Sequence, residues 1–380
     1  MSASDTTADV IVVGGGIAGV SVAYELSGSA RVVLLEMEST LAYHTTGRSA
    51  ALFLETYGGE QIRALTTGSR SFFEQPPDHF DSALVSPRPL LEFGVVGRGH
   101  LVESLHRSVL PLVADAELLD ADRCCELFSL LRRDVVECGM YEPRALALDV
   151  AALHQGFVRG ARSNGTEIVR DSAVAALERG ASTWTATTRD GSRFQAPVVV
   201  DAAGAWADVV ATAAGVPGVG LRPLRRTIFM VASPLGEASR DWPNLSDVEE
   251  SFYANPEGAQ FLCSPADETP CAPSDAKPDE LEIARAIDAI DATTTLGVRS
   301  VSSSWAGLRT FTADRNFALG EDPEAPGFFW LAGQGGYGIQ TAPATARLAA
   351  ALVLGRQAPP DLVDRGLDVE RLAPRRVMSS

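Results

Sequence analysis

The chain has 380 residues and a formal net charge of −17 at pH 7, because 49 acidic residues outnumber 32 basic ones. This charge repels phosphate backbones and anionic lipid, which argues against nucleic-acid binding and electrostatic docking on membranes. Lys277 is the single lysine and does not follow a glycine-rich loop, so Walker-type phosphate binding and Schiff-base catalysis have no candidate residue.

Length and composition predict two or three domains with real hydrophobic cores, since 46% of the residues are hydrophobic. The N-terminus has no positively charged leader, and no segment approaches the roughly 20 apolar residues of a membrane span. The five cysteines include no CxxC pair, so we expect neither a disulfide framework nor a metal site. These features predict a protein of the reducing cytoplasm that is not inserted in a membrane.

The first informative segment is a β-α-β unit at the N-terminus. An apolar run at 9–13 precedes the loop Gly14-Gly-Gly-Ile-Ala-Gly19, helical spacing follows over 20–26, and a second strand at 31–35 ends in Glu36. A GxGxxG motif between a strand and a helix, with an acidic residue 17 positions later, predicts a dinucleotide site.

Each part of this unit has a physical task. Gly14 permits the tight turn, Gly16 lets backbone amides approach a pyrophosphate, and Gly19 lets the helix pack closely with its positive end at the phosphates. Glu36 would accept hydrogen bonds from ribose hydroxyls and would disfavour a 2′-phosphate, which makes NADP a poor fit.

Two later segments repeat the strand-to-helix junction. Short strands at 172–176, 184–187 and 193–195 lead to a buried strand at 197–201, followed by Ala-Ala-Gly204-Ala-Trp. A strand at 327–332 precedes Gly333-Gln-Gly-Gly-Tyr-Gly-Ile-Gln340 and a helix over 341–354, whose N-terminus could stabilise negative charge on a cofactor ring.

We therefore expect an α/β protein with a discontinuous, Rossmann-like FAD-binding domain, formed by residues 1–84, 146–219 and 313–380. Residues 85–145 and 220–312 have a different sequence pattern, with proline-rich turns between strand-like runs. They predict a second, α+β substrate-binding domain of antiparallel sheet and helices.

The three glycine-rich junctions together resemble FAD enzymes of the D-amino acid oxidase superfamily. More closely, several segments are similar to bacterial FAD-dependent D-arginine dehydrogenases, and they run almost the full length of the chain. These segments are Tyr43-His-Thr-Thr-Gly-Arg-Ser-Ala-Ala51, Ser86-Pro-Arg-Pro89, Leu153-His-Gln-Gly156, Glu250-Ser-Phe-Tyr253, Trp305-Ala-Gly-Leu-Arg309 and Gln334-Gly-Gly-Tyr-Gly-Ile-Gln-Thr341.

The motifs and this resemblance together imply a set of residues at FAD. They are Gly14, Gly16, Ile17, Ala18, Gly19, Glu36, His44, Thr46, Gly47, Arg48, Ser49, Val174, Ala203, Gly204, Trp206, Gly333, Gly335, Gly336, Tyr337, Gly338, Ile339 and Gln340.

The resemblance also implies the residues that hold the substrate. Arg226 and Arg309 match two arginines that grip its carboxylate, and a planar guanidinium pairs well with two carboxylate oxygens. Tyr57 and Tyr253 match aromatic residues that close over the substrate, and Gly336 matches a backbone position near its amine.

The chain departs from the D-arginine dehydrogenase pattern at the side-chain pocket. Leu52 and Leu54 replace a histidine and a threonine, and Leu90 replaces the glutamate that faces the guanidinium. Because a buried cation without an anionic partner is costly, we expect arginine to be a poor substrate. The remaining residues of the predicted pocket are Asn244, Ser246, Glu250 and Tyr337.

The predicted reaction is oxidation of the Cα–N bond of a neutral or apolar D-amino acid by hydride transfer to flavin N5. The imino acid product would hydrolyse to a 2-oxo acid and ammonia. Among the histidines, His44 is the first candidate for a general base, although a structural role is favoured for it. His154 is expected to be a surface or packing residue. Because Lys277 lies in an acidic, proline-rich loop, a lysine that promotes reaction with oxygen is not expected at the flavin, which favours a dehydrogenase over an oxidase.

Three functions stay open at this point. Besides the D-amino acid enzyme, the chain could oxidise an N-alkyl or cyclic amino acid or a 2-hydroxy acid, or it could be a flavin-binding relay subunit without turnover. The electron acceptor, the substrate side chain, the oligomeric state and covalent attachment of the flavin are not specified by the sequence.

Overall fold

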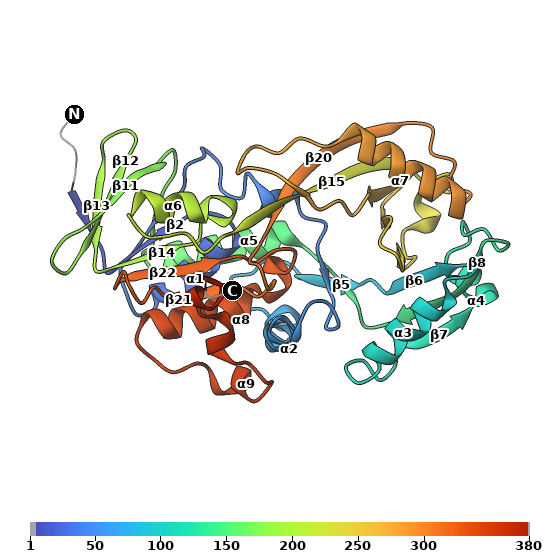
Figure 1. Cartoon of the computed structure of the whole chain (residues 1–380), viewed down its shortest axis with the longest axis horizontal. Helices are drawn as coiled ribbons and strands as arrows, with labels where there is room; N and C mark the ends of the chain where they lie inside the picture. The colour runs from blue at the N-terminus through green and yellow to red at the C-terminus, as the bar shows by residue number, and fades with distance from the viewer. Residues whose placement is uncertain (1–4, 379–380) are drawn as a thin grey trace.

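The computed structural model describes residues 5–378. Its centre is a six-stranded sheet with the strand order β10-β3-β2-β14-β22-β21, parallel except for the edge strand β21. The strands are β10 (Glu167–Val169), β3 (Val32–Leu35), β2 (Val10–Val13), β14 (Val198–Asp201), β22 (Phe328–Ala332) and β21 (Ala318–Glu321). Three separated segments of the chain thus build one sheet, as expected for a discontinuous cofactor domain (Figure 1).

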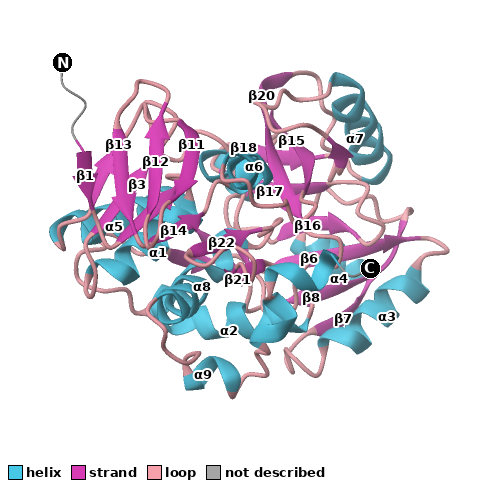
Figure 2. Ribbon diagram, turned by 60° about the vertical axis from the view of Figure 1, so that its left-hand side comes forward, coloured by secondary structure: helices cyan, strands magenta, loops and turns pink. Residues whose placement is uncertain are grey.

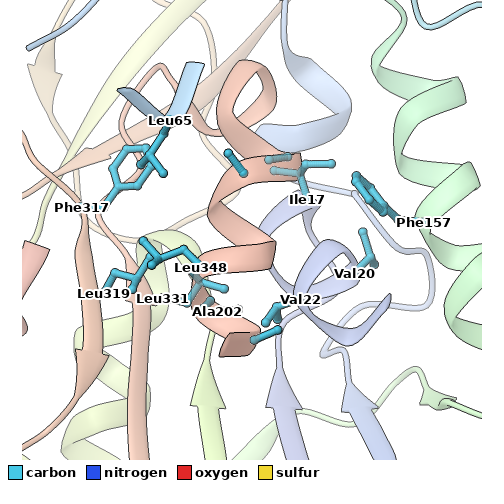
Figure 3. Close-up of a cluster of buried hydrophobic side chains, with 14 of the residues drawn as sticks. Ile17, Val20, Val22, Leu65, Phe157, Ala202, Phe317, Leu319, Leu331 and Leu348 are labelled. Atoms are coloured by element: carbon cyan, nitrogen blue, oxygen red, sulfur yellow. The ribbon is translucent and has the colours of Figure 1, made fainter. Parts of the chain in front are cut away.

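Both faces of this sheet are covered, which explains why its strands are apolar runs rather than alternating ones. Val10 and Val12 face helices α1 (Ile17–Ser27), α2 (Glu60–Glu74), α5 (Val150–Ser163) and α8 (Gly338–Val353). Figure 3 shows part of this core, where Ile17 of α1 lies between Phe157 of α5 and the α8 ribbon, and Val20 lies next to Phe157.

The opposite face of the central sheet packs against a smaller layer. Ile11 and Val13 point there, toward α6 (Ala207–Ala213) and a four-stranded sheet. The strands of that sheet are β1 (Asp5–Thr7), β13 (Arg193–Ala196), β12 (Trp184–Thr188) and β11 (Val174–Arg179), visible at the left of Figure 2.

A nine-stranded sheet forms the other half of the molecule. Its strands are β19 (Thr269–Pro270), β15 (Arg222–Ala232), β20 (Val301–Phe311), β18 (Gln260–Ser264), β17 (Tyr253–Glu257), β16 (Asn244–Asp247), β6 (Leu90–Val95), β8 (Val136–Glu142) and β7 (Glu117–Asp120). All its pairings are antiparallel except that of β16 with β6. This parallel pair joins two regions of sequence far apart in the chain.

The two faces of the nine-stranded sheet differ in character. Leu91, Phe93 and Leu245 point into a core with α4 (Ala121–Leu127) and α7 (Glu280–Thr293). Side chains alternate along a strand, so Leu90 and Asn244 point to the opposite face, where they line a cavity. Helix α3 (Gly99–Val109) flanks that cavity.

Several shorter elements lie outside the large sheets and their covering helices. Strands β4 (Leu52–Phe53), β9 (Leu146–Leu148) and β5 (Val85–Pro87) form a three-stranded sheet, and α9 (Pro360–Val363) packs near α2. Single-turn 3-10 helices are η1 (Thr45–Arg48), η2 (Gly204–Trp206), η3 (Gly236–Ser239), η4 (Val369–Leu372) and η5 (Pro374–Met378). Within residues 5–378, no helix is long and apolar enough to cross a bilayer, no cluster of metal-ligating side chains occurs, and all five cysteines are free.

Candidate active site

The glycine loop between β2 and α1 allows very close packing. Gly14 has φ +110, and a Cβ there would come within 2.5 Å of the Ala202 carbonyl oxygen at the end of β14. A Cβ on Gly19 would lie 1.8 Å from the Gly14 carbonyl oxygen. Gly14 and Gly19 therefore position the helix, while Gly16 lines the cavity at its N-terminus.

Glu36 follows β3 and holds the same loop. Its carboxylate accepts hydrogen bonds from the Gly15 amide at 2.6 Å and from the Glu38 amide at 2.8 Å. Burial raises the pKa of Glu36, and these two hydrogen bonds oppose that shift. Val174 begins β11 two residues beyond Ser172, whose amide donates to the Glu36 carbonyl oxygen.

His154 holds the loop from the opposite side. This residue of α5 is 6% exposed, and its Nε2 atom lies 2.9 Å from the Gly15 carbonyl oxygen. Burial lowers its pKa, so the neutral ring is favoured. His154 therefore has a packing role, as expected, and it also fixes the glycine loop through the Gly15 carbonyl oxygen. The sequence did not indicate this contact because the two residues are far apart in the chain.

The segment from Thr45 to Ser49 joins the glycine loop to β20. The Thr46 hydroxyl accepts a hydrogen bond from the Ile17 amide at 3.0 Å, at the first turn of α1. Thr45 donates to the Leu308 carbonyl oxygen at 2.8 Å, and Arg48 donates to the Ala306 carbonyl oxygen at 2.9 Å. The cofactor side and the substrate side of the molecule are therefore hydrogen-bonded to each other here.

His44 is occupied by structural contacts. Its Nε2 atom lies 2.9 Å from Glu38, and its ring packs against Trp206 with a centroid distance of 4.5 Å. These contacts support the structural role that was favoured over a general base.

The third glycine-rich junction lies between β22 and α8. The Gly335 amide donates to the Thr310 carbonyl oxygen at 2.8 Å, and a Cβ on Gly335 would meet the Phe311 ring at 2.1 Å. A Cβ on Gly336 would lie 3.1 Å from the Arg309 guanidinium. The backbone at Gly336 therefore lies directly beside one of the two predicted substrate arginines.

Strands β15 and β20 place both of these arginines on one face. Arg226 pairs with Gly307, and Arg309 follows Gly307 by two residues, so the two side chains point the same way. Both guanidinium groups line the cavity.

Arg226 is buried and only partly neutralised. It is 7% exposed, its Nε atom donates to the Asp267 carbonyl oxygen at 2.9 Å, and its Nη2 atom lies 3.4 Å from Glu268. Burial and the neighbouring charge of Arg309 lower the pKa of Arg226, although an arginine remains protonated at physiological pH. The buried cation of Arg226 beside the half-buried cation of Arg309 makes this position suitable for a carboxylate.

Tyrosines lie beside the arginine pair. Arg309 donates to the Tyr57 hydroxyl at 3.3 Å, and the Tyr57 ring meets the Tyr337 ring edge-to-face at 4.9 Å. Tyr253 begins β17 and lines the cavity. Tyr337 is 6% exposed and lies outside the cavity lining, so it supports Tyr57 from behind.

The predicted side-chain pocket is brought together at the other end of the cavity. Leu52, Leu54, Leu90, Asn244, Ser246 and Glu250 all line it. Glu92 lines it too, and sequence reasoning missed this residue. The period of two along β6 could have found it, because Glu92 must share the face of Leu90. Besides the predicted Glu250, Glu92 thus adds a second carboxyl group to the pocket, on the same strand face as Leu90.

One continuous cavity of about 400 Å³ connects the glycine loop, the arginine pair and the side-chain pocket. Of the predicted cofactor residues, those that line it are Gly16, Ile17, Ala18, Thr46, Arg48, Ser49, Gly204, Gly333, Gly335, Gly336, Gly338, Ile339 and Gln340. Those outside its lining are Gly14, Gly19, Glu36, His44, Gly47, Val174, Ala203, Trp206 and Tyr337.

These residues fit a flavin dinucleotide. Bare glycine backbone lines the cavity at the N-termini of α1 and α8, where a phosphate or an anionic ring would be stabilised. The glycines at which an added Cβ would clash with neighbouring atoms lie where strand, loop and helix are in contact.

Comparisons with known proteins agree with this geometry. A family model described as DAO, FAD dependent oxidoreductase, matches residues 9–352. Human mitochondrial dimethylglycine dehydrogenase is 28% identical over 279 residues, which cover 68% of this chain and 30% of that protein. The chain thus spans less than a third of the length of that relative.

Two further proteins match nearly the whole chain. FAD-dependent oxidoreductase domain-containing protein 1 of Bos taurus is 25% identical over 407 residues, covering 91% of this chain and 81% of its own length. The crystal structure of glycine oxidase from Geobacillus kaustophilus has the same fold, with a TM-score of 0.85 at 20% identity over 98% of this chain and 99% of that one. With a family model that matches most of its length, the chain belongs to the DAO family of FAD-dependent oxidoreductases.

Proposed function

We propose that this protein oxidises the Cα–N bond of a D-amino acid whose carboxylate lies between Arg226 and Arg309. The observation that carries this proposal is the arginine pair on one face of β15 and β20, in the same cavity as the glycine backbone around Gly336. The D configuration is supported by the sequence segments that resemble D-arginine dehydrogenases.

The chain's own residues would orient the substrate. Arg226 and Arg309 fix the carboxylate, and Tyr57 and Tyr253 enclose it. When bound, FAD supplies the acceptor for the hydride that leaves Cα. The substrate amine must be unprotonated, because an ammonium nitrogen has no lone pair to stabilise the developing imine. The released imino acid then hydrolyses to a 2-oxo acid and ammonia without further help from the protein.

The side-chain pocket suits a substrate with an apolar stem. Leu52, Leu54 and Leu90 would contact that stem, as expected for the neutral or apolar side chain predicted from the sequence. Glu92 lies on the same strand as Leu90, two residues farther along the cavity wall.

A second candidate function uses the same clamp. Two arginines recognise any small carboxylate, so an N-alkyl or cyclic amino acid, or a 2-hydroxy acid, would be held in the same way. Dimethylglycine dehydrogenase and glycine oxidase, which are similar to this chain, are named for such small carboxylates. A relay subunit without turnover is less favoured, because electron relay does not require an arginine pair in the cavity.

We favour a dehydrogenase over an oxidase. Lys277 is 78% exposed and paired with Asp275 at 2.7 Å, and its ammonium group lies outside the cavity lining. Asp275 in turn pairs with Arg48, which lines the cavity. The acidic loop that carries Lys277 therefore does contact the cofactor side of the cavity, but Lys277 itself does not. Rapid reoxidation of the substrate-reduced enzyme by air would contradict this choice.

Anaerobic bleaching of the bound flavin tests the proposed function. The panel contains D-leucine, D-phenylalanine, D-arginine, sarcosine, D-proline and D-lactate. We expect D-amino acids to reduce the flavin fastest, and Arg309→Met to lower kcat/KM by roughly 100-fold because the carboxylate loses a charge-assisted bond.

The matched control is Arg285→Met on the exposed face of α7, which should reduce at the wild-type rate. Fastest reduction by sarcosine or D-proline would favour the second candidate. Wild-type rates in Arg309→Met, or no bleaching by any panel member, would contradict the proposed clamp and its chemistry.

A further inference from the structure

The far end of the cavity holds a carboxyl group that the proposed reaction does not use. Glu92 on β6 is partly exposed and lines the cavity. It pairs with Ser246 of β16 in the parallel ladder, beside the pair formed by Leu90 and Asn244. The four side chains therefore form one wall, with apolar Leu90 followed by the carboxyl group.

The Glu92 carboxyl group has no complementary partner. Within residues 5–378, no hydrogen-bond donor contacts it and no cation contributes to its pKa. Burial, together with the neighbouring carboxylates of Glu142 and Glu250, raises that pKa to about 8. At neutral pH the group is mostly protonated.

The surrounding elements supply mainly negative charge. Glu142 of β8 accepts a hydrogen bond from Thr56 at 2.9 Å, and Glu250 lies in the turn after β16. Arg63 of α2 lines the same cavity, but its Nε atom donates to the Thr56 carbonyl oxygen at 3.0 Å. Helix α3 contributes only the uncharged residues Leu105, Ser108 and Val109 to the lining.

A second, independent observation also indicates a ligand here. Asn244 is 1% exposed and lines the cavity, and its Nδ2 atom has no hydrogen-bond partner among the residues that the structure describes. Leaving a buried amide donor unpaired costs about 1–3 kcal/mol, so such groups usually have a partner in the occupied state. Because no side-chain hydrogen bond fixes this amide, it can present its oxygen or its nitrogen to a ligand.

We propose that Glu92 and Asn244 form a side-chain subsite that takes a basic nitrogen at the end of the substrate, with Glu92 releasing its proton to solvent as the cation enters. This inference rests on the proposed carboxylate clamp, which fixes the other end of the substrate. A guanidinium or ammonium group offers donors to the Glu92 carboxylate and to the Asn244 amide oxygen, while the apolar stem lies along Leu90.

The proton released by Glu92 gives the subsite a distinct pH dependence. A ligand that needs the ionised carboxylate binds about tenfold more weakly for each pH unit below the pKa of about 8. Affinity for a cationic ligand should therefore rise as the pH rises toward 8, whereas affinity for an uncharged ligand of the same length should not.

Binding of non-reacting ligands tests the subsite without turnover. 5-Guanidinopentanoate carries a carboxylate and a guanidinium but no α-amine, and 5-ureidopentanoate is the counterpart of the same length with an uncharged terminal group. We would titrate the FAD-loaded protein with each and follow the flavin absorbance. From pH 6.5 to 8.5 the affinity for 5-guanidinopentanoate should rise at least tenfold relative to that for 5-ureidopentanoate.

Glu92→Gln should abolish this rise, and it should fold normally because the carboxyl group it replaces is mostly neutral at pH 7. Glu249→Gln is the matched control, since Glu249 pairs with Arg98 at the surface and should leave the rise intact. Equal affinity for the two ligands at pH 8.5, or an unchanged pH dependence in Glu92→Gln, would overturn the proposal.

Turnover separates this inference from the proposed function. D-arginine should reduce the flavin faster than D-citrulline, whose side chain is uncharged, and Glu92→Gln should lower that ratio of rates by roughly tenfold. If D-leucine reduces the flavin and D-arginine has no advantage, the subsite is refuted and the reaction stands. If no amino acid reduces the flavin but the binding pattern is observed, the reaction is refuted and the subsite stands.

Discussion

Arg226 is held by the protein so that part of its guanidinium remains for a ligand. The Asp267 carbonyl oxygen accepts from Nε, and Glu268 lies near Nη2 while also bonding Arg315. Such contacts fix the plane of the guanidinium before a substrate arrives, which reduces the entropy lost on binding.

This arrangement predicts that lysine cannot replace Arg226. In Arg226→Lys a single ammonium group would have to reach both the Asp267 carbonyl oxygen and the substrate, so kcat/KM should fall by roughly 100-fold with unchanged FAD content. Steady-state kinetics and the flavin absorbance of the purified variant measure the two quantities. Arg222→Lys at the exposed start of β15 is the control, and similar losses in both variants would contradict a specific role.

Single residues also show where sequence reasoning reaches its limit. Leu90, Asn244 and Ser246 were expected in the pocket from the resemblance to D-arginine dehydrogenases, and all three line it. Glu92 lies outside any motif and was missed, although strand periodicity was sufficient to place it. His154 could not be assigned to the Gly15 carbonyl oxygen, since no local pattern relates two residues so distant in the chain.

At the scale of elements, helix α1 depends on the absence of a side chain at Gly19. The helix approaches the preceding loop so closely that a methyl group there would overlap the Gly14 carbonyl oxygen. Gly28, just after the helix, has open space around it and a φ of −73.

Gly19→Ala should therefore destabilise the protein by about 3 kcal/mol or more and weaken FAD binding, because α1 must move away from the loop. Chemical denaturation and reconstitution of the apoprotein with FAD provide the two measurements. Gly28→Ala is the matched control and should change stability little. Equal stability of the two variants would show that the loop adjusts freely.

The boundaries of elements were predicted well where a local signal exists. The strand expected at 327–332 is β22, and the helix expected from 341 begins at Gly338, three residues earlier. The parallel pairing of β6 with β16 was not expected, since each strand alone fits an antiparallel sheet. Pairing between distant segments depends on tertiary packing, which local patterns do not report. The proposed domain boundaries and the specific likeness to D-arginine dehydrogenases stay predictions.

At the scale of the whole molecule, several buried carboxyl groups make stability depend on pH. Burial raises the pKa of Asp201 well above its usual value, that of Glu92 to about 8 and that of Glu142 to about 7. Between pH 4.5 and 8 these groups hold protons in the folded protein that the unfolded chain has already released. Stability conferred by their protonation is therefore lost as pH rises through this window.

We expect the melting temperature of the FAD-loaded protein to be lower at pH 8 than at pH 6 by about 2 °C or more. Flavin fluorescence during a thermal ramp measures it. Glu142→Gln should flatten the dependence, because the amide stays neutral at both pH values. Lys277 and Arg48 lower the pKa of Asp275 to about 2, so the stability conferred by its ionisation is constant from pH 6 to pH 8 and is lost only in strong acid. A melting temperature that rises from pH 6 to pH 8 would contradict the prediction.

The interleaved origin of the central sheet also constrains how the protein is made. Val10 of β2 pairs with Val198 of β14, and Val199 of β14 pairs with Phe328 of β22. During synthesis the apolar strand β2 leaves the ribosome long before its neighbour β14, and β22 follows later still. The nascent chain thus exposes unpaired strand edges until β22 has emerged. Chaperone supply and translation speed, rather than the stability of the finished enzyme, should then limit the yield of soluble protein.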